Sequence, residues 1–320
     1  MLKARSFILS CLFLLSTPAM AEDDTSKVLI LHPDSESATQ VLAGLADEVG
    51  EDLNLISVEF SSKLSTADID TLLAEHRADA LVLMNNPTVE LYRAYQQSKP
   101  EGTTFPPAVM LLTSFLEKAA VGIQNATGIN YEVAAVSSMV NLRSLIESKV
   151  ERVGVVYRDV FEDFVREQQI MAAQEKIQLV PRRVRSTHVD RDLKPLLRQL
   201  LVSDIDALWV LNDNQLLSPT SVAKTWLPAL KHNDFPVVVG VQALVSSEFR
   251  FGTFALLPDH EALGAQAAQL LFELEESEWR ADAIAVQEPV AVKKVLNVSQ
   301  ARRLTELNDD ALRGIDVLIE

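Results

Sequence analysis

The sequence predicts an α/β fold with two doubly wound lobes, each built on a parallel sheet, and a cleft between them. From residue 27 onward, short apolar runs rich in Val, Ile and Leu alternate with longer segments of helical spacing. The apolar runs are continuous, which is typical of strands that helices cover on both faces. This pattern occurs twice, and the two series are separated near residues 122–138, where Gly, Asn and Thr accumulate.

The first series contains four expected strands and three expected helices. The strands are "KVLILH" (27–32), "NLISVEF" (54–60), "ALVLM" (80–84) and "AVMLLT" (108–113). The helices are 36–49, 66–77 and 88–97. Capping signals agree with these ends, because Ser35 or Ser37 precedes the first helix, Gly50 follows it, and Ser65 or Thr66 precedes the second.

The second series repeats the alternation. Its strands are "RVGVVY" (152–157), "IQLVPRRV" (177–184), "ALWVLN" (207–212) and "PVVVGV" (236–241). Its helices are 134–148, 160–175, 189–202, 218–232 and 258–276. Ser218 followed by Pro219 is a helix cap with proline at the first helical position.

The N-terminus is typical of a secretory signal peptide. Lys3 and Arg5 precede an apolar run at 7–15, and a small-x-small motif ends at Ala21. We therefore expect residues 1–21 to be removed by cleavage after Ala21, and the protein to be periplasmic. Two alternatives are weaker. The apolar run is short for a membrane anchor, and lipoprotein cleavage before Cys11 would leave almost no apolar segment ahead of the cut.

Composition narrows the class of partner. The 320-residue chain is 48% hydrophobic and carries a formal net charge of −16, which becomes −18 once the two basic residues of 1–21 are lost. Such an acidic protein repels phosphate backbones, so we expect no nucleic-acid partner. The single cysteine lies in the same segment, so the mature chain has no disulfide. No later segment contains 18 consecutive apolar residues, and we expect a soluble protein.

Polar residues follow the end of one strand in an unusual cluster. In "ALWVLNDNQLLS" (207–218), an apolar run is followed directly by Asn212, Asp213 and Asn214. Ligands of parallel α/β sheets bind at the carboxyl ends of the strands. The alternative role is turn formation and helix capping, but Ser218 already offers a cap. We therefore expect the cluster to contact a ligand, which amide and carboxylate groups would orient.

Other strand ends supply further candidates. His32 and Ser35 follow the first strand, Thr113 and Ser114 follow the fourth, and polar residues also occur at 85–86 and 157–159. If the strand ends of both lobes face one cleft, His32, Ser35, Thr113 and Ser114 contact the ligand. The alternative for His32 is a local hydrogen bond.

Two tyrosines complete the set of candidate ligand-binding residues. Tyr131 lies near the break between the series and Tyr157 near a strand end, where aromatic rings could wall an apolar ligand site. Burial in the core is the alternative for each. Enzymatic signals are missing: the chain has no G-x-S-x-G, HExxH, P-loop or G-x-G-x-x-G motif. We expect a protein that is not an enzyme and uses no metal or cofactor.

Four segments resemble a known family. They are "NATGINYE" (125–132), "VERVGVVYRDVFEDF" (150–164), "DALWVLNDNQLLS" (206–218) and "VLNVSQARRL" (295–304). On them the chain resembles the ABC-transporter substrate-binding proteins whose better-known members bind aromatic amino acids, within the type I periplasmic-binding-protein group. The resemblance runs from about residue 27 to the C-terminus. It places Asp213 and Asn214 at the D-N positions of the family.

The resemblance implies two lobes, joined by three crossovers, that close on a small organic ligand. It predicts a first lobe of 25–128 plus 254–284 and a second lobe of 129–253 plus 285–320. The implied partner is the membrane permease of an ABC transporter, with a membrane-bound sensor kinase or cyclase as the alternative, and the implied state is a monomer. The chain departs from the family pattern at 113–117, 240–241 and 253–255, where it is less polar. These departures predict a more apolar pocket.

Overall fold

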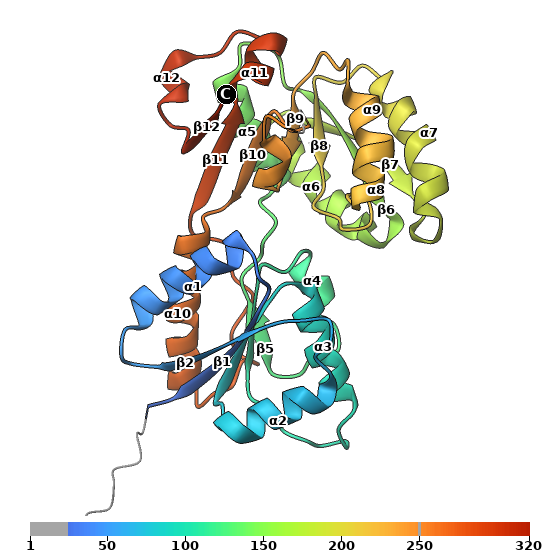
Figure 1. Ribbon diagram of the computed structural model, residues 1–320. Helices are drawn as coiled ribbons and strands as arrows, with labels where there is room; N and C mark the ends of the chain where they lie inside the picture. The colour runs from blue at the N-terminus through green and yellow to red at the C-terminus, as the bar shows by residue number, and fades with distance from the viewer. Residues whose placement is uncertain (1–24, 249–250) are drawn as a thin grey trace, which may run out of the picture.

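The first lobe is a parallel sheet covered by helices on both faces. The computed structural model describes residues 25–248 and 251–320 (Figure 1). The strands of this lobe are β1 (Lys27–His32), β2 (Asn54–Glu59), β3 (Ala80–Met84), β4 (Ala108–Leu111) and β5 (Ala126–Gly128). Its helices are α1 (Glu36–Val49), α2 (Thr66–His76), α3 (Asn86–Gln97), α4 (Leu116–Ala119) and α10 (His260–Glu276). The strand order is β2-β1-β3-β4-β5.

Alternation along the strands explains how both faces are buried. Val28 and Ile30 belong to the core cluster that includes α1 and α10, whereas Leu29 and Leu31 belong to the cluster beneath α2 and α3. Every strand pair in this sheet is parallel. Side chains buried on both faces account for the continuous apolar runs in the sequence.

The second lobe contains a larger, mostly parallel sheet. Its strands are β6 (Arg152–Arg158), β7 (Gln178–Val184), β8 (Ala207–Val210), β9 (Val237–Val239), β10 (Phe254–Pro258), β11 (Val292–Asn297) and β12 (Val317–Ile319). Their order is β12-β11-β10-β9-β8-β6-β7, and only the β10–β11 pair among these is antiparallel. The two sheets confirm the predicted fold class of two doubly wound α/β lobes.

Helices again cover both faces of this sheet. They are α5 (Ala135–Leu145), α6 (Glu162–Gln174), α7 (Val189–Leu201), α8 (Pro219–Ser221), α9 (Leu227–Leu230), α11 (Val298–Leu304) and α12 (Asp309–Leu312). A π-helical turn, Val222–Trp226, separates α8 from α9 where the sequence predicts one helix over 218–232. Pro228 lacks an N–H group and cannot continue the regular ladder at this point.

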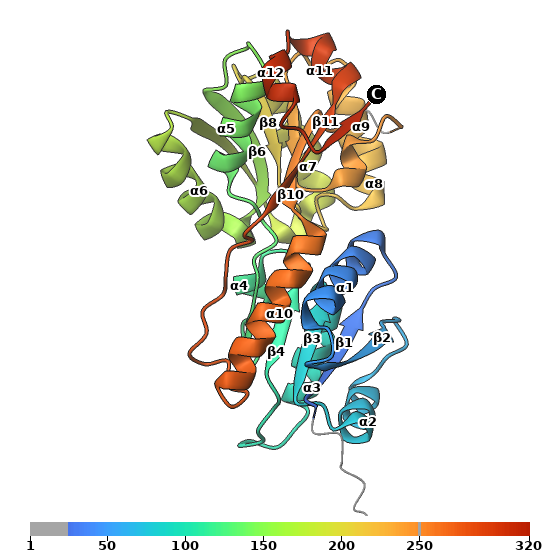
Figure 2. The ribbon, with the colours of Figure 1, turned by 90° about the vertical axis from the view of Figure 1, so that its left-hand side faces the viewer.

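One predicted lobe boundary differs from the structure. The family resemblance predicts that 254–284 belongs to the first lobe, but β10 pairs with β9 and β11 in the second sheet. The chain enters the first lobe only at α10, which lies beside α1 (Figure 2). The run from Phe254 to Pro258 is fully apolar and buried, so it forms an internal strand of the second sheet, between β9 and β11.

Three crossovers join the lobes: residues 129–134, the turn between β10 and α10, and residues 287–291. The first and third crossovers lie side by side. The Asn130 N–H donates to the Gln287 carbonyl at 2.8 Å, and the Gln287 N–H donates to the Gly128 carbonyl at 2.9 Å. From α10, Gln266 Oε1 accepts a hydrogen bond from the Val290 N–H at 3.0 Å. Hydrogen bonds therefore link the first crossover to the third, and the third to α10, which follows the second. The three crossovers form one hinge.

Helices α1 and α10 touch backbone to backbone at two glycines. A Cβ atom at Gly264 would lie 2.1 Å from the Val41 carbonyl oxygen, and one at Gly44 would lie 2.0 Å from the Glu261 oxygen.

We expect Gly264→Ala to lower the free energy of unfolding by about 2 kcal/mol, because the helices must separate. Urea denaturation measures this loss. Gly314→Ala is the control, since its Cβ would have no atom nearer than 3.5 Å; an equal effect of both would contradict the packing argument.

The predicted signal peptide, 1–21, lies outside the described residues and stays a prediction. Within 25–248 and 251–320, none of the helices combines the length and apolarity needed to span a bilayer.

Candidate functional site

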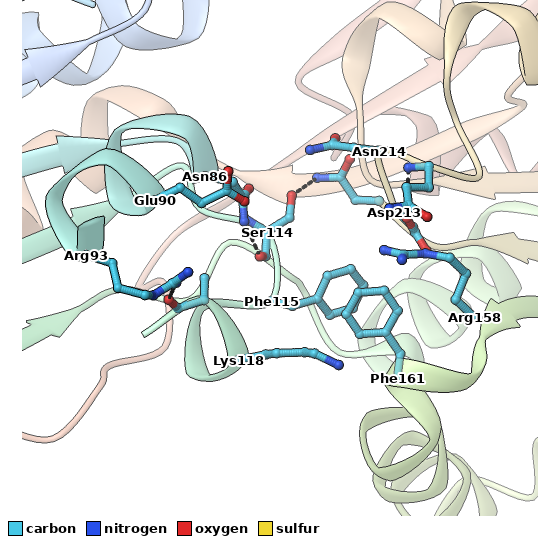
Figure 3. A pocket seen from close by; sticks show the side chains of 13 residues that line it. Asn86, Glu90, Arg93, Ser114, Phe115, Lys118, Arg158, Phe161, Asp213 and Asn214 are labelled. Carbon is cyan, nitrogen blue, oxygen red and sulfur yellow. Dashed lines mark hydrogen bonds and ion pairs between the residues drawn. The ribbon is translucent and has the colours of Figure 1, made fainter. Parts of the chain in front are cut away.

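A cavity of about 280 Å³ lies between the lobes, at the carboxyl ends of their strands. Both lobes contribute to its lining (Figure 3). From the first lobe come Asn86, Glu90, Arg93, Ser114, Phe115, Lys118 and Ala119. From the second come Arg158, Phe161, Asn212, Asp213, Asn214 and Gln215. Ligand sites of proteins commonly measure roughly 300–1,000 Å³, so this volume suits a small molecule.

The lobes touch each other through residues of this cavity. Asn212 Nδ2 donates to Ser114 Oγ at 3.1 Å. The rings of Phe115 and Phe161 stack with centroids 3.8 Å apart and planes inclined by 22°. Lys118 Nζ donates to the carbonyl of Val160, next to Phe161, at 2.5 Å. Three contacts from three separate strand ends therefore converge on one place.

The loops after β3 and β4 carry backbone strain. Asn85, Leu112 and Phe115 have φ angles of 100°, 51° and 53° without being glycine. Such conformations cost about 1–3 kcal/mol each and concentrate at functional sites. Side-chain bonds hold these loops in place: Asn86 Nδ2 donates to the Ser114 carbonyl at 2.9 Å, and Asn86 Oδ1 accepts from the Ser114 N–H at 3.0 Å.

In the second lobe, Asp213 forms a buried ion pair with Arg158. Arg158 Nε donates to Asp213 Oδ2 at 2.6 Å, and the side chains are 13% and 0% exposed, respectively. Asp213 Oδ1 accepts from the Gln215 N–H at 2.9 Å. The Arg158 guanidinium also lies over the Phe161 ring, with Cζ 5.0 Å from the centroid. Asp213 thus fixes both the turn after β8 and the direction of Arg158.

Glu132 connects the hinge to the cavity. It belongs to the first crossover, and its Oε2 accepts a hydrogen bond from the Phe115 N–H at 2.8 Å. Its Oε1 is buried and has no hydrogen-bond partner within the described residues. Burial raises the pKa of Glu132 to about 7, although the Phe115 N–H favours the charged form.

The structure brings four of the nine predicted ligand-binding residues to the cavity: Ser114, Asn212, Asp213 and Asn214. Thr113, His32 and Ser35 do not line it. Thr113 is fully buried, with its hydroxyl bonded to the Leu111 carbonyl. His32 Nδ1 lies 3.1 Å from the Pro33 carbonyl, and Ser35 caps α1. Their polar groups are therefore used locally.

The two predicted tyrosines also lie away from the cavity lining. Tyr131 Oη is 3.1 Å from His260 Nε2, so it joins the first and second crossovers. Tyr157 Oη donates to Glu162 Oε2 at 3.0 Å, at the start of α6. Burial raises the pKa of each tyrosine to about 12, so both are neutral hydroxyls at neutral pH. Tyr131 is a hinge residue in this arrangement.

Sequence reasoning missed the charged residues of the cavity. Arg158 is the last residue of β6, at the polar strand end 157–159 where the sequence pattern favoured Tyr157. Lys118, Glu90 and Arg93 lie on α4 and α3, so the strand-end rule does not find them. Within the described part of the chain, no three His, Cys, Asp or Glu side chains are grouped as metal ligands would be.

Comparison with solved structures gives matches over nearly the whole chain. The ABC domain in complex with L-Trp from Streptococcus pneumonia has a TM-score of 0.61 and 18% identity, covering 92% of this chain and 100% of that chain. A ligand-free, open substrate-binding protein with adhesive properties from Clostridium difficile has a TM-score of 0.65 and 15% identity, covering 92% and 99%. The chain has the type I periplasmic-binding-protein fold. A periplasmic ribose ABC transporter protein from Conexibacter woesei is more distant, with a TM-score of 0.51 and 14% identity over 88% and 98%.

These similarities concern the fold of the two lobes. No protein-family model matches the sequence, and no curated protein matches it. In this type I fold, the cavity lies between the lobes, and Phe115 of its lining contacts Glu132 of the first crossover. Of the solved structures named above, one is an ABC domain that holds L-Trp, one is a substrate-binding protein and one is a periplasmic ribose ABC transporter protein.

Proposed function

We propose that this protein is the exported, substrate-binding component of an ABC-type transport system. It would bind a small organic ligand between its lobes and present the closed form to a membrane permease. The observation that carries this proposal is the convergence of polar and aromatic side chains from both lobes on one cavity. A ligand that contacts both lobes stabilises the closed arrangement by its differential affinity. The L-Trp complex among the similar structures supports a small ligand.

A ligand screen tests the proposal. The protein without residues 1–21 is mixed with amino acids, aromatic acids, sugars and polyols, and unfolding is followed by thermal shift and native mass spectrometry. A ligand at 100 times its Kd should stabilise the fold by about 2.7 kcal/mol. A screen without a hit would contradict the proposal.

We expect Asn214→Ala to weaken ligand binding about fivefold, which corresponds to one hydrogen bond. Asn141→Ala is the control, because the Asn141 side chain donates to the Ser137 carbonyl within α5.

Export has its own measurement. The protein recovered from the periplasmic fraction should begin at Glu22 by N-terminal sequencing and should elute as a monomer in size-exclusion chromatography. Retention of residues 1–21 would contradict cleavage after Ala21.

A further inference from the structure

Three cationic side chains line the cavity: Arg93, Lys118 and Arg158. Two acidic side chains, Glu90 and Asp213, also line it. Both carboxylate oxygens of Asp213 already accept hydrogen bonds, one from Arg158 at 2.6 Å and one from the Gln215 N–H at 2.9 Å. Asp213 is also only 1% exposed, so it offers no free oxygen to the ammonium group of a ligand.

Glu90 is the other acid, and it lies in a different environment. It is exposed on α3, at the edge of the cavity. An ion pair with an exposed carboxylate contributes little, since water and salt screen both charges. A ligand ammonium therefore finds one solvated partner, whereas a ligand carboxylate finds Arg158, whose side chain is only 13% exposed.

Arg158 has the geometry of a carboxylate receptor. Its Nε is used by Asp213, but no hydrogen bond within residues 25–248 and 251–320 reaches its two terminal nitrogens. Figure 3 shows the guanidinium extending from β6 into the cavity, toward the stacked phenylalanines. The bond to Asp213 and the contact with the Phe161 ring fix this direction before any ligand arrives. Paired terminal nitrogens match the two oxygens of a carboxylate.

The neighbouring wall is aromatic. Phe115 and Phe161 are 9% and 8% exposed, and their stacked rings lie beside both Arg158 and Lys118. Lys118 Nζ lies 5.0 Å from the Phe161 ring centroid and uses one of its three donors on the Val160 carbonyl. A ligand ring can pack against this pair while its charged group reaches the cations.

We infer that the cavity between the lobes selects a small aromatic monocarboxylate that lacks an α-ammonium group. The carboxylate binds the free terminal nitrogens of Arg158, with Lys118 as a second cation, and the ring packs against Phe115 and Phe161. This inference rests on the proposed function and names the class of its ligand.

A matched set of three compounds tests the inference by isothermal titration calorimetry. 3-Phenylpropionate carries the ring and the carboxylate, L-phenylalanine adds the α-ammonium, and 3-phenylpropionamide replaces the carboxylate with a neutral amide. We expect 3-phenylpropionate to bind at least about tenfold more tightly than either of the others. Tighter binding of L-phenylalanine, or equal binding of acid and amide, would overturn the inference while leaving the proposed function intact.

Two lysine variants test whether Lys118 contacts the ligand carboxylate. Lys118→Gln should weaken binding of 3-phenylpropionate about fivefold without changing that of the amide. Lys63→Gln is the matched control, since Lys63 is an exposed lysine of the same lobe that lies outside the cavity. An unchanged affinity in Lys118→Gln would overturn the cationic role. Binding of none of the three compounds would overturn the ligand class, and the proposed function would fall only if the wider screen also gave no ligand.

Discussion

Asp213→Ala is expected to lower the free energy of unfolding by about 3 kcal/mol, because it leaves the Arg158 guanidinium without its partner in a mostly buried place. The change also removes the acceptor of the Gln215 N–H and loosens the turn after β8. Urea denaturation followed by far-UV circular dichroism measures the loss. Asp163→Ala is the matched control, since the Asp163–Arg166 pair is exposed on α6 and its removal should change little.

A double-mutant cycle separates the ion pair from other effects of Asp213. The double variant Asp213→Ala with Arg158→Leu removes both charges, so its stability loss should be clearly smaller than the sum of the two single losses. A coupling energy below about 0.5 kcal/mol would show that the pair does not act as a unit. Asp213 would then hold the turn alone, and Arg158 would not be oriented by it.

The long strand and helix patterns were predictable because burial imposes them directly. Strands β1, β3 and β6 have continuous apolar runs since both faces of each sheet are covered, and the sequence ranges match within a residue or two. The short strands β5 and β12 have three residues each and exist only because neighbouring strands supply their hydrogen bonds. A local pattern of that length carries no period to detect.

The site was predictable in position but only partly in composition. The rule that ligands bind at the carboxyl ends of parallel strands located Ser114 and the 212–214 cluster. It gave no means of knowing that Asp213 is neutralised by Arg158, because their contact depends on the order of β6 and β8 in the sheet. The rule also selected residues such as Ser35 that cap a helix at the same kind of strand end.

Glu132→Gln is expected to raise the free energy of unfolding by about 2 kcal/mol at pH 8 and to leave it nearly unchanged at pH 5. The pKa of Glu132 is raised by burial from 4.5 to about 7, so the folded protein binds this proton more tightly than the unfolded chain does. The contribution of the protonated form to stability is complete below pH 4.5 and is lost as the pH rises through 7. A shift of this size corresponds to about 3 kcal/mol.

The variant should recover somewhat less than that amount. Glutamine keeps an oxygen that can accept from the Phe115 N–H, but its amide group replaces Oε1 in a place without a partner. An unsatisfied buried group costs about 1 kcal/mol or more. At pH 5 the folded wild-type carboxyl is protonated, but the carboxyl of the unfolded chain is mostly ionised, so about 1 kcal/mol of the stabilisation is already lost. This loss offsets the cost of the amide in the variant, and the two proteins should be nearly equal there.

The measurement is the difference between wild type and variant across pH 5–8, by urea denaturation at constant ionic strength. The difference is needed because burial lowers the pKa of His260, so this residue makes the fold less stable as the pH falls, opposite to Glu132. Glu117→Gln, an exposed change in the same lobe, should give a flat difference. The stability difference between Glu132→Gln and wild type could instead prove independent of pH. The Glu132 carboxyl would then be open to water, and its hydrogen bond from the Phe115 N–H would not link a buried charge in the hinge to the cavity.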